Sequence, residues 1–347
     1  MILGLETTIY SGGFPPESQT QALAIAHDTD PRVSVYRWSA GFGTKYSDPA
    51  SALGTDCNGV DFSSDNTALA LASAQTPFIH AYQWSNSDGF GSKYSNPATL
   101  PPANGLDVHF SPDGAYILLG HTSSPFISAY PWSAGFGAKY ANPASLPSSQ
   151  GRGAAVSPSS ADVAVSTVST PFQAVYPWSS GFGVRYSNPA TLPTGAGNGI
   201  GFSPDGLDVA IAHNISPRVS VYPWTTGVGF GAKYSNPATL PVSDAFGISF
   251  TPDSLTIAVS HGTTPFISVY PWATGVGFGA KYANPATTPT NTGLRAAFGI
   301  AGSALAVVHA TTPFVTVYPW SAGGFGAKYA NPATLPPDTS RSADFNQ

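Results

Sequence analysis

Six of the seven histidines recur at matching places in an internal repeat, where their imidazoles could bind a metal ion or form hydrogen bonds. In five copies a histidine lies four residues before a proline, and a serine or threonine lies three residues after that proline. In one copy the two types are exchanged, with Ser73 in the histidine place and His80 in the hydroxyl place. One imidazole per repeat is too widely spread for a shared tetrahedral metal site, so the exchange predicts a histidine–hydroxyl hydrogen bond inside each such repeat. The five histidines are His27, His121, His213, His261 and His309.

The basic residues could bind an anionic partner. Every lysine directly precedes the tyrosine of a repeat, and an arginine takes this place in the remaining copy. Two interpretations stay open. Each long stem could pack over a neighbouring aromatic ring, or the charges could form a rim that docks acidic polysaccharide, lipopolysaccharide phosphate or a capsid surface. The rim residues are Lys45, Lys93, Lys139, Arg185, Lys233, Lys281 and Lys328.

Residues for catalysis are scarce. The 18 acidic residues are scattered, and the chain has no Gly-x-Ser-x-Gly elbow, no P-loop and no His-Glu-x-x-His motif. A few charged or nucleophilic side chains fall on strands expected near a central channel. They do not recur from blade to blade, but they could mark a site: Cys57, Asp61, Asp107, His109 and Arg152. We therefore expect no catalytic residues, no metal or other cofactor, and no enzymatic activity.

Composition excludes several classes of protein. Only 9% of the 347 residues are charged and the net charge is −5, which argues against a general nucleic-acid binder. Cys57 is the single cysteine, so an intramolecular disulfide is excluded. No apolar run approaches the length of a membrane span, and the first residues lack the features of a signal peptide. We expect no membrane insertion, and either a virion-surface location or a cytoplasmic protein or one released without such a signal.

The elements that must position these residues follow from the repeat. The seven tryptophans are spaced by 46 or 48 residues, which is the period of a four-stranded propeller blade. The copy at residues 199–241 shows a short apolar run, a Ser-Pro-Asp-Gly turn, two alternating runs and a fourth segment that ends at Asn-Pro. The sequence predicts an all-β protein, a seven-bladed β-propeller of four-stranded antiparallel blades.

The two ends of the repeat predict how the ring closes. In each copy the first-strand aromatic position lies 16 residues after the repeat's tyrosine, and Tyr329 and Phe345 keep this spacing. The first copy begins only at its second strand, in residues 21–27. We therefore expect residues 341–345 to complete the first blade as its innermost strand. Residues 18–347 would form a single propeller, and residues 1–17 an N-terminal arm or attachment segment.

The aromatic side chains allow two readings. A tyrosine stands two residues before every tryptophan, so the two rings share one face of the third strand. They could form the core between blades, or they could serve as exposed stacking platforms for carbohydrate. The tryptophans are Trp38, Trp84, Trp132, Trp178, Trp224, Trp272 and Trp320.

The Ser-Pro-Asp-Gly turns at residues 111–114 and 203–206, with the valine–tyrosine strands, resemble WD-repeat and YVTN-type β-propellers. This resemblance implies the architecture and leaves the function open, because such folds have very different activities. The regular repeat and low-charge surface are also similar to propeller proteins of tailed-phage virions. That similarity implies a structural or interaction protein, such as a decoration, tail or fibre protein. Its partners would be other particle subunits, bound through residues 1–17, or a surface glycan. The alternatives are a carbohydrate-binding lectin and, third, a propeller hydrolase or lyase.

Overall fold

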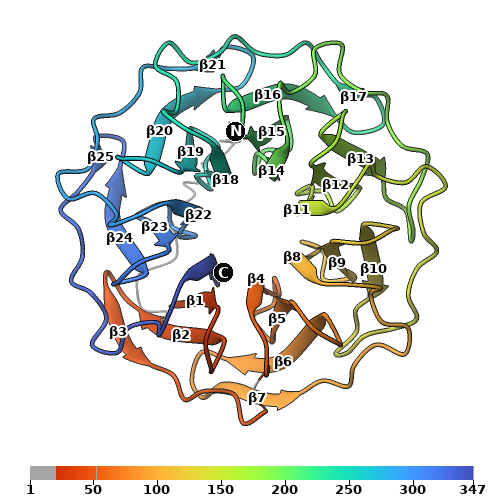
Figure 1. Cartoon of the computed structure of the whole chain (residues 1–347), viewed down its shortest axis with the longest axis vertical. Coiled ribbons are helices and arrows are strands. Elements are labelled where there is room, and N and C mark those ends of the chain that lie inside the picture. The colour runs from red at the N-terminus through yellow and green to blue at the C-terminus, as the bar shows by residue number, and fades with distance from the viewer. Residues whose placement is uncertain (1–20, 52, 347) are drawn as a thin grey trace, which may run out of the picture.

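The computed structural model describes residues 21–51 and 53–346, and the arm predicted for residues 1–17 lies outside this part. Seven antiparallel sheets surround a central axis as the blades of a propeller (Figure 1). The prediction of an all-β, seven-bladed fold is confirmed. In the described part of the chain, no helix is present that could span a membrane.

The first three blades are built from the following strands, named from the channel outwards. Blade 1 contains β26 (Ser340–Phe345), β1 (Gln21–His27), β2 (Val33–Trp38) and β3 (Phe42–Lys45). Blade 2 contains β4 (Cys57–Phe62), β5 (Ala68–Ser73), β6 (Ile79–Ser85) and β7 (Gly89–Lys93). Blade 3 contains β8 (Gly105–Phe110), β9 (Tyr116–His121) and β10 (Ile127–Pro131).

The other four blades follow the same order. Blade 4 contains β11 (Gly151–Val156), β12 (Asp162–Thr167) and β13 (Gln173–Pro177). Blade 5 contains β14 (Gly197–Phe202), β15 (Asp208–His213), β16 (Val219–Thr225) and β17 (Gly229–Phe230). Blade 6 contains β18 (Ala245–Phe250), β19 (Thr256–His261), β20 (Ile267–Ala273) and β21 (Gly277–Phe278). Blade 7 contains β22 (Gly293–Phe298), β23 (Ala304–His309), β24 (Val315–Ser321) and β25 (Gly324–Phe325).

The ring closes through the C-terminal strand, as the spacing of the repeat predicts. Strand β26 pairs antiparallel with β1, with Leu23 opposite Phe345. In Figure 1 the dark blue end of the chain lies beside the red first blade at the centre of the ring. The side chain of Asn346 accepts a hydrogen bond of 2.6 Å from the backbone N–H of Ala22 and holds the end of the strand.

The fourth strands differ from the prediction because most of them are very short. Blades 5, 6 and 7 have fourth strands of two residues, and blades 3 and 4 have only an isolated bridge in that place. Those five blades have a proline before the third-strand tryptophan, and proline has no N–H to donate to a neighbouring strand. Arg37 and Gln83 take its place in blades 1 and 2, where the fourth strand has four or five residues.

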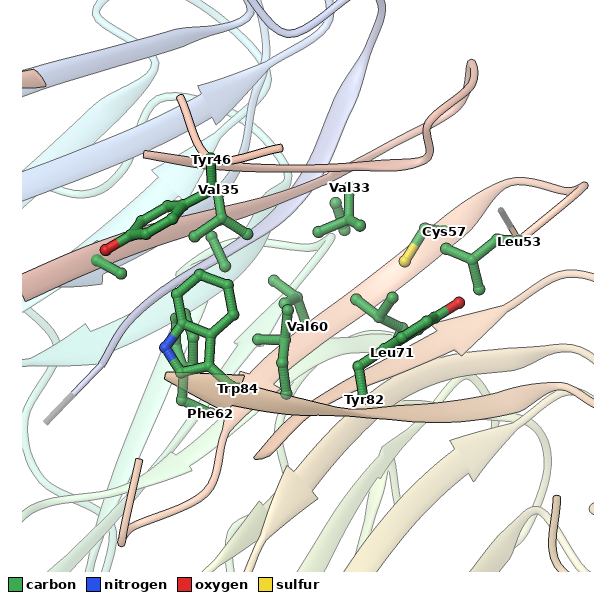
Figure 2. Close-up of a cluster of buried hydrophobic side chains, with 14 residues drawn as sticks. Val33, Val35, Tyr46, Leu53, Cys57, Val60, Phe62, Leu71, Tyr82 and Trp84 are labelled. Carbon is green, nitrogen blue, oxygen red and sulfur yellow. The ribbon is translucent and has the colours of Figure 1, made fainter. Parts of the chain in front are cut away.

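The core lies between the blades. At the junction of blades 1 and 2, the Tyr82 and Trp84 rings of one blade pack against Val33 and Val35 of the other (Figure 2). The third-strand tyrosines are at most 1% exposed and the tryptophans at most 8%. The prediction that these tyrosine and tryptophan rings are exposed stacking platforms for carbohydrate is therefore wrong, since the adjacent blade covers them.

The repeated histidines form the hydrogen bonds that the sequence predicts. The six imidazole–hydroxyl distances, from Nε2 to the side-chain oxygen, lie between 2.9 and 3.1 Å. Each bond crosses the hairpin between the second and third strands of a single blade. In blade 2 the exchanged pair of Ser73 and His80 forms the same bond at 3.1 Å.

Candidate functional site

The central channel is lined by the seven innermost strands, which contribute side chains at successive levels. At the end where these strands begin, the second residue of every one of them lines a cavity of about 330 Å³. These residues are Asn58, Leu106, Arg152, Asn198, Phe246, Leu294 and Arg341. Gln150 and Arg295 complete the lining of this cavity, which we call the mouth cavity.

Three arginines line the mouth cavity, and they differ in how far their charges are neutralised. Arg341 is neutralised by Asp28, with 2.6 Å between Nη2 and Oδ2. Arg152 has no carboxylate partner within the described residues and donates instead to the neutral Asn198 amide oxygen at 2.6 Å. Burial and the nearby Arg295 charge both lower the pKa of Arg152. This guanidinium therefore lies in an environment that lacks negative charge.

Arg295 extends across the channel and contacts the backbone of several blades. Its guanidinium donates to the carbonyl oxygen of Phe246 at 2.6 Å, and to those of Asn198 and Arg152 at 3.4 Å. Its Nη2 atom also lies 3.8 Å from Oδ2 of Asp107. The side chain lines the mouth cavity and also a second cavity further along the channel. Arg295 thus forms the partition between two chemically different spaces.

The second cavity has a volume of about 400 Å³ and contains the other charged residues of the channel, so we call it the carboxyl cavity. His109 lies between two carboxylates: Nδ1 is 3.4 Å from Oδ1 of Asp61, and Nε2 is 3.7 Å from Oδ2 of Asp107. Asp344, from the closing strand β26, lines the same cavity. Strands from three consecutive blades thus bring three carboxyl groups and one imidazole together.

Each of the three carboxyl groups also joins one blade to the next. Asp344 accepts a hydrogen bond of 3.0 Å from the backbone N–H of Phe62, and Asp61 accepts one of 2.7 Å from Phe110. Asp107 accepts one of 3.0 Å from Ala154. These bonds satisfy inner-strand N–H groups that face the neighbouring blade, so part of the charge in the channel has a structural role.

The charges in the carboxyl cavity shift one another's pKa. Burial alone would lower the pKa of His109, but Asp61 and Asp107 raise it well above its usual value. Burial raises the pKa of Asp61, and burial together with the Asp61 charge raises that of Asp344 strongly. Burial opposes ionisation of Asp107 too, but His109 and Arg295 outweigh it and lower the pKa. The two aspartates thus favour the protonated imidazole of His109, which is a poor proton acceptor for general-base catalysis.

The irregular inner-strand residues singled out in the sequence are only partly brought together. Asp61, Asp107 and His109 meet in the carboxyl cavity, and Arg152 lies in the mouth cavity. Cys57 does not belong to them, because it is fully buried in the core between blades 1 and 2, where burial raises the pKa of its thiol. Within the described ranges, no three His, Cys, Asp or Glu side chains converge so as to hold a metal ion.

Sequence reasoning missed Arg295, Arg341 and Asp344. A usable signal was present for Asp344, because it directly precedes Phe345 as Asp61 precedes Phe62 and His109 precedes Phe110. All three stand at the fifth position of an innermost strand. Aligning the repeats on that phenylalanine would have placed these side chains at one level of the channel.

The rim lysines lie on the outer segments of the blades, and their partners are mostly amides. The ammonium groups of Lys139, Lys233, Lys281 and Lys328 donate to the asparagine three residues later, and Lys45 pairs with Asp48. Burial of the stems lowers the pKa of Lys93, Lys139, Lys233, Lys281 and Lys328. The docking role of the rim stays a prediction.

Comparisons with known proteins identify the fold. No protein-family model and no curated protein matches this chain. A candidate 6-phosphogluconolactonase from Bacteroides uniformis is similar in structure, with a TM-score of 0.72 at 14% identity, over 94% of this chain and 99% of the other. The periplasmic gluconolactonase of Pseudomonas aeruginosa gives a TM-score of 0.68 at 14% identity, over 95% and 99% of the two chains. The chain therefore shares the seven-bladed propeller of these proteins, and at such low identity the likeness establishes the fold alone.

Proposed function

We propose that this propeller is a non-catalytic binding protein whose ligand is a small organic anion held in the mouth cavity. The observation that carries the proposal is the neighbouring pair of Arg152 and Arg295, which line one cavity while Arg152 has no carboxylate partner in the described part of the chain. The Arg152 charge has no offsetting carboxylate among the described residues, so the cavity keeps a positive potential that an anion would relieve, although Asp107 lies 3.8 Å from Arg295. Guanidinium groups bind carboxylate and phosphate oxygens by paired hydrogen bonds.

The lining of the mouth cavity suggests the class of anion. A volume of about 330 Å³ suits a molecule of the size of a sugar acid. Asn58, Gln150 and Asn198 offer amides for hydroxyl groups, while Leu106 and Phe246 offer apolar contact for a carbon skeleton. The similar propellers named as gluconolactonases make sugar acids reasonable first probes.

The state of the titratable groups supports binding without turnover. Lactone hydrolysis would need a group that activates water, and the two aspartates beside His109 raise its pKa, which favours the imidazolium over the neutral base. The three channel carboxyl groups accept backbone hydrogen bonds that link the blades. Each of these carboxyl groups therefore has a structural role in joining neighbouring blades.

The test is calorimetric titration of the full chain with gluconate and 6-phosphogluconate, with glucose as the neutral control. We expect both acids to bind, the doubly charged one more tightly, and the affinity to fall with added salt. The variant Arg152→Gln should weaken binding by about tenfold or more, whereas the rim variant Lys233→Gln should leave it unchanged. Absence of binding, or a loss caused by Lys233→Gln and not by Arg152→Gln, would contradict the proposal.

A separate assay tests the non-catalytic part. Glucono-δ-lactone should hydrolyse at the same rate with and without the protein. A rate that rises in proportion to protein concentration would show an enzyme instead. The role as a virion subunit with particle partners stays a prediction, and locating the protein in purified particles would test it.

A further inference from the structure

We propose that the carboxyl cavity is a second ligand site, separate from the mouth cavity, and that it takes a small organic ammonium ion with an apolar body. The two cavities share only one lining residue, Arg295. Four contacts from its guanidinium, three to carbonyl oxygens and one to Asp107, hold this residue across the channel. A ligand at one end is thus separated from a ligand at the other by a fixed side chain.

The walls of the carboxyl cavity have two distinct halves. Strands β26, β4 and β8 contribute Asp344, Asp61, Asp107 and His109 on one side. Strands β11, β14 and β18 contribute mainly glycine and aliphatic side chains, among them Ala154, Ala155, Val156, Ile200 and Ile248. A cavity of about 400 Å³ is large enough for a small molecule, and this one has a charged wall facing an aliphatic wall. Its shape fits a ligand with a polar head and an apolar body.

The balance of charges determines which head group fits. The charged groups facing the cavity are the carboxyls Asp61, Asp107 and Asp344, the imidazolium of His109 and the guanidinium of Arg295. His109 lies between Asp61 and Asp107, and Arg295 is held by carbonyl oxygens and by Asp107. Two cations therefore offset two carboxylates, and Asp344 is left as the third.

Asp344 is the carboxyl group with which a bound ammonium ion would form an ion pair. Its Oδ2 accepts the Phe62 N–H at 3.0 Å, and the carboxyl lines the carboxyl cavity. It also lines a smaller adjoining cavity of about 190 Å³, together with Asp61 and His109. Burial and the charge of Asp61 raise its pKa well above the usual value, which favours the protonated carboxyl. A bound ammonium would supply the positive charge that allows this carboxyl to ionise.

Binding is therefore coupled to release of a proton. The protonated Asp344 carboxyl and the incoming ammonium form a carboxylate–ammonium pair, and the carboxyl proton leaves to solvent. Affinity should accordingly rise with pH until Asp344 ionises in the free protein. A neutral ligand of the same shape would release no proton and would leave Asp344 unchanged.

The experiment is titration of the full chain with benzylammonium at neutral pH, repeated in two buffers with different heats of ionisation. Benzyl alcohol serves as the neutral isostere. We expect benzylammonium to bind with release of close to one proton, and benzyl alcohol to bind about tenfold more weakly or worse. The variant Asp344→Asn resembles the protonated carboxyl and keeps an oxygen for the Phe62 N–H, so it should fold. It should lose both the tight binding of benzylammonium and the proton release.

Three results would overturn the inference. Equal affinity for benzyl alcohol would show a merely apolar pocket, binding of benzylammonium without proton release would exclude Asp344, and unchanged binding by a folded Asp344→Asn variant would do the same. The proton count in the natural chain decides the matter even if the variant fails to fold. Arg152→Gln should leave benzylammonium binding intact. A failure of the ammonium site in the carboxyl cavity can therefore be distinguished from a failure of the anion site in the mouth cavity.

Discussion

At the scale of single residues, the histidine–hydroxyl pairs make the stability of the ring depend on pH. Burial lowers the pKa of the imidazoles from 6.5 to about 4 in five pairs and to about 3 in His80. The unfolded chain then binds protons that the folded protein does not. The stabilisation by these residues is complete above pH 6.5 and is lost as the pH falls towards the folded values.

Blade 4 provides a natural replacement for one of these pairs. It has Thr167 and Ala174 where blade 6 has His261 and Ser268. We predict that the double variant His261→Thr with Ser268→Ala loses less stability between about pH 7 and about pH 5 than the natural chain, by up to about 2 kcal/mol. Urea unfolding at about pH 7 and about pH 5 measures the difference.

The single variant Ser268→Ala is the matched control. It leaves the buried Nε2 of His261 without its partner and should cost about 1–2 kcal/mol at neutral pH. If the double variant and the natural chain lose stability in parallel on acidification, the histidines do not titrate as described.

At the scale of elements, one residue of the third strand decides how far the fourth strand extends. Tyr82 pairs with Lys93 in blade 2, where Gln83 has an N–H, whereas β17 in blade 5 ends at Phe230 beside Pro223. Both segments keep a glycine opposite this residue. A Cβ on Gly91 or Gly231 would lie 2.9 Å from the Cβ of Gln83 or Pro223. Because the packing is alike, the missing N–H of proline explains the difference.

The reciprocal substitutions test this explanation. Pro223→Gln should extend the outer strand of blade 5 towards Lys233 and slow amide exchange in residues 229–234 by about tenfold. Gln83→Pro should do the opposite to residues 89–93 of blade 2. Hydrogen exchange followed by mass spectrometry measures both. Unchanged exchange in both variants would mean that the glycine-rich segments, and not the proline, limit the strand.

At the scale of the whole molecule, the ring depends on its closing strand. Strand β26 pairs with β1, and Phe345 packs edge-on against Trp38 with ring centroids 5.3 Å apart. Asp344 in the same strand bonds to blade 2. Deleting residues 340–347 should therefore lower the free energy of unfolding by more than about 3 kcal/mol.

Thermal unfolding of the truncated chain gives this number, and a synthetic peptide of residues 338–347 added in excess should restore part of the loss. A truncated protein that melts at the temperature of the full chain would contradict the claim that the pairing of β26 with β1 stabilises the ring.

The repeat explains why the architecture could be predicted from the sequence and why only some of the channel residues could be. Blade count and closure follow from spacings that recur seven times, and the histidine bonds from a pair that recurs six times, since each copy must bury the same face. Positions that vary between copies carry no such constraint. Asp162, for example, accepts hydrogen bonds from Trp224 and Tyr186, but most other blades have no acid at its place. Arg295 likewise crosses the channel to residues about 50 to 190 positions away, a reach that spacing does not reveal.

The central claim, an anion site between Arg152 and Arg295, can be tested most directly by anomalous diffraction from crystals soaked in selenate. Selenium locates the oxyanion without any assumption about the natural ligand. We predict a selenium peak in the mouth cavity, placed so that selenate oxygens lie within hydrogen-bond distance of both guanidinium groups, and no such peak in crystals of Arg152→Gln. Peaks confined to the rim lysines, or a mouth cavity without selenium in the natural chain, would contradict the account.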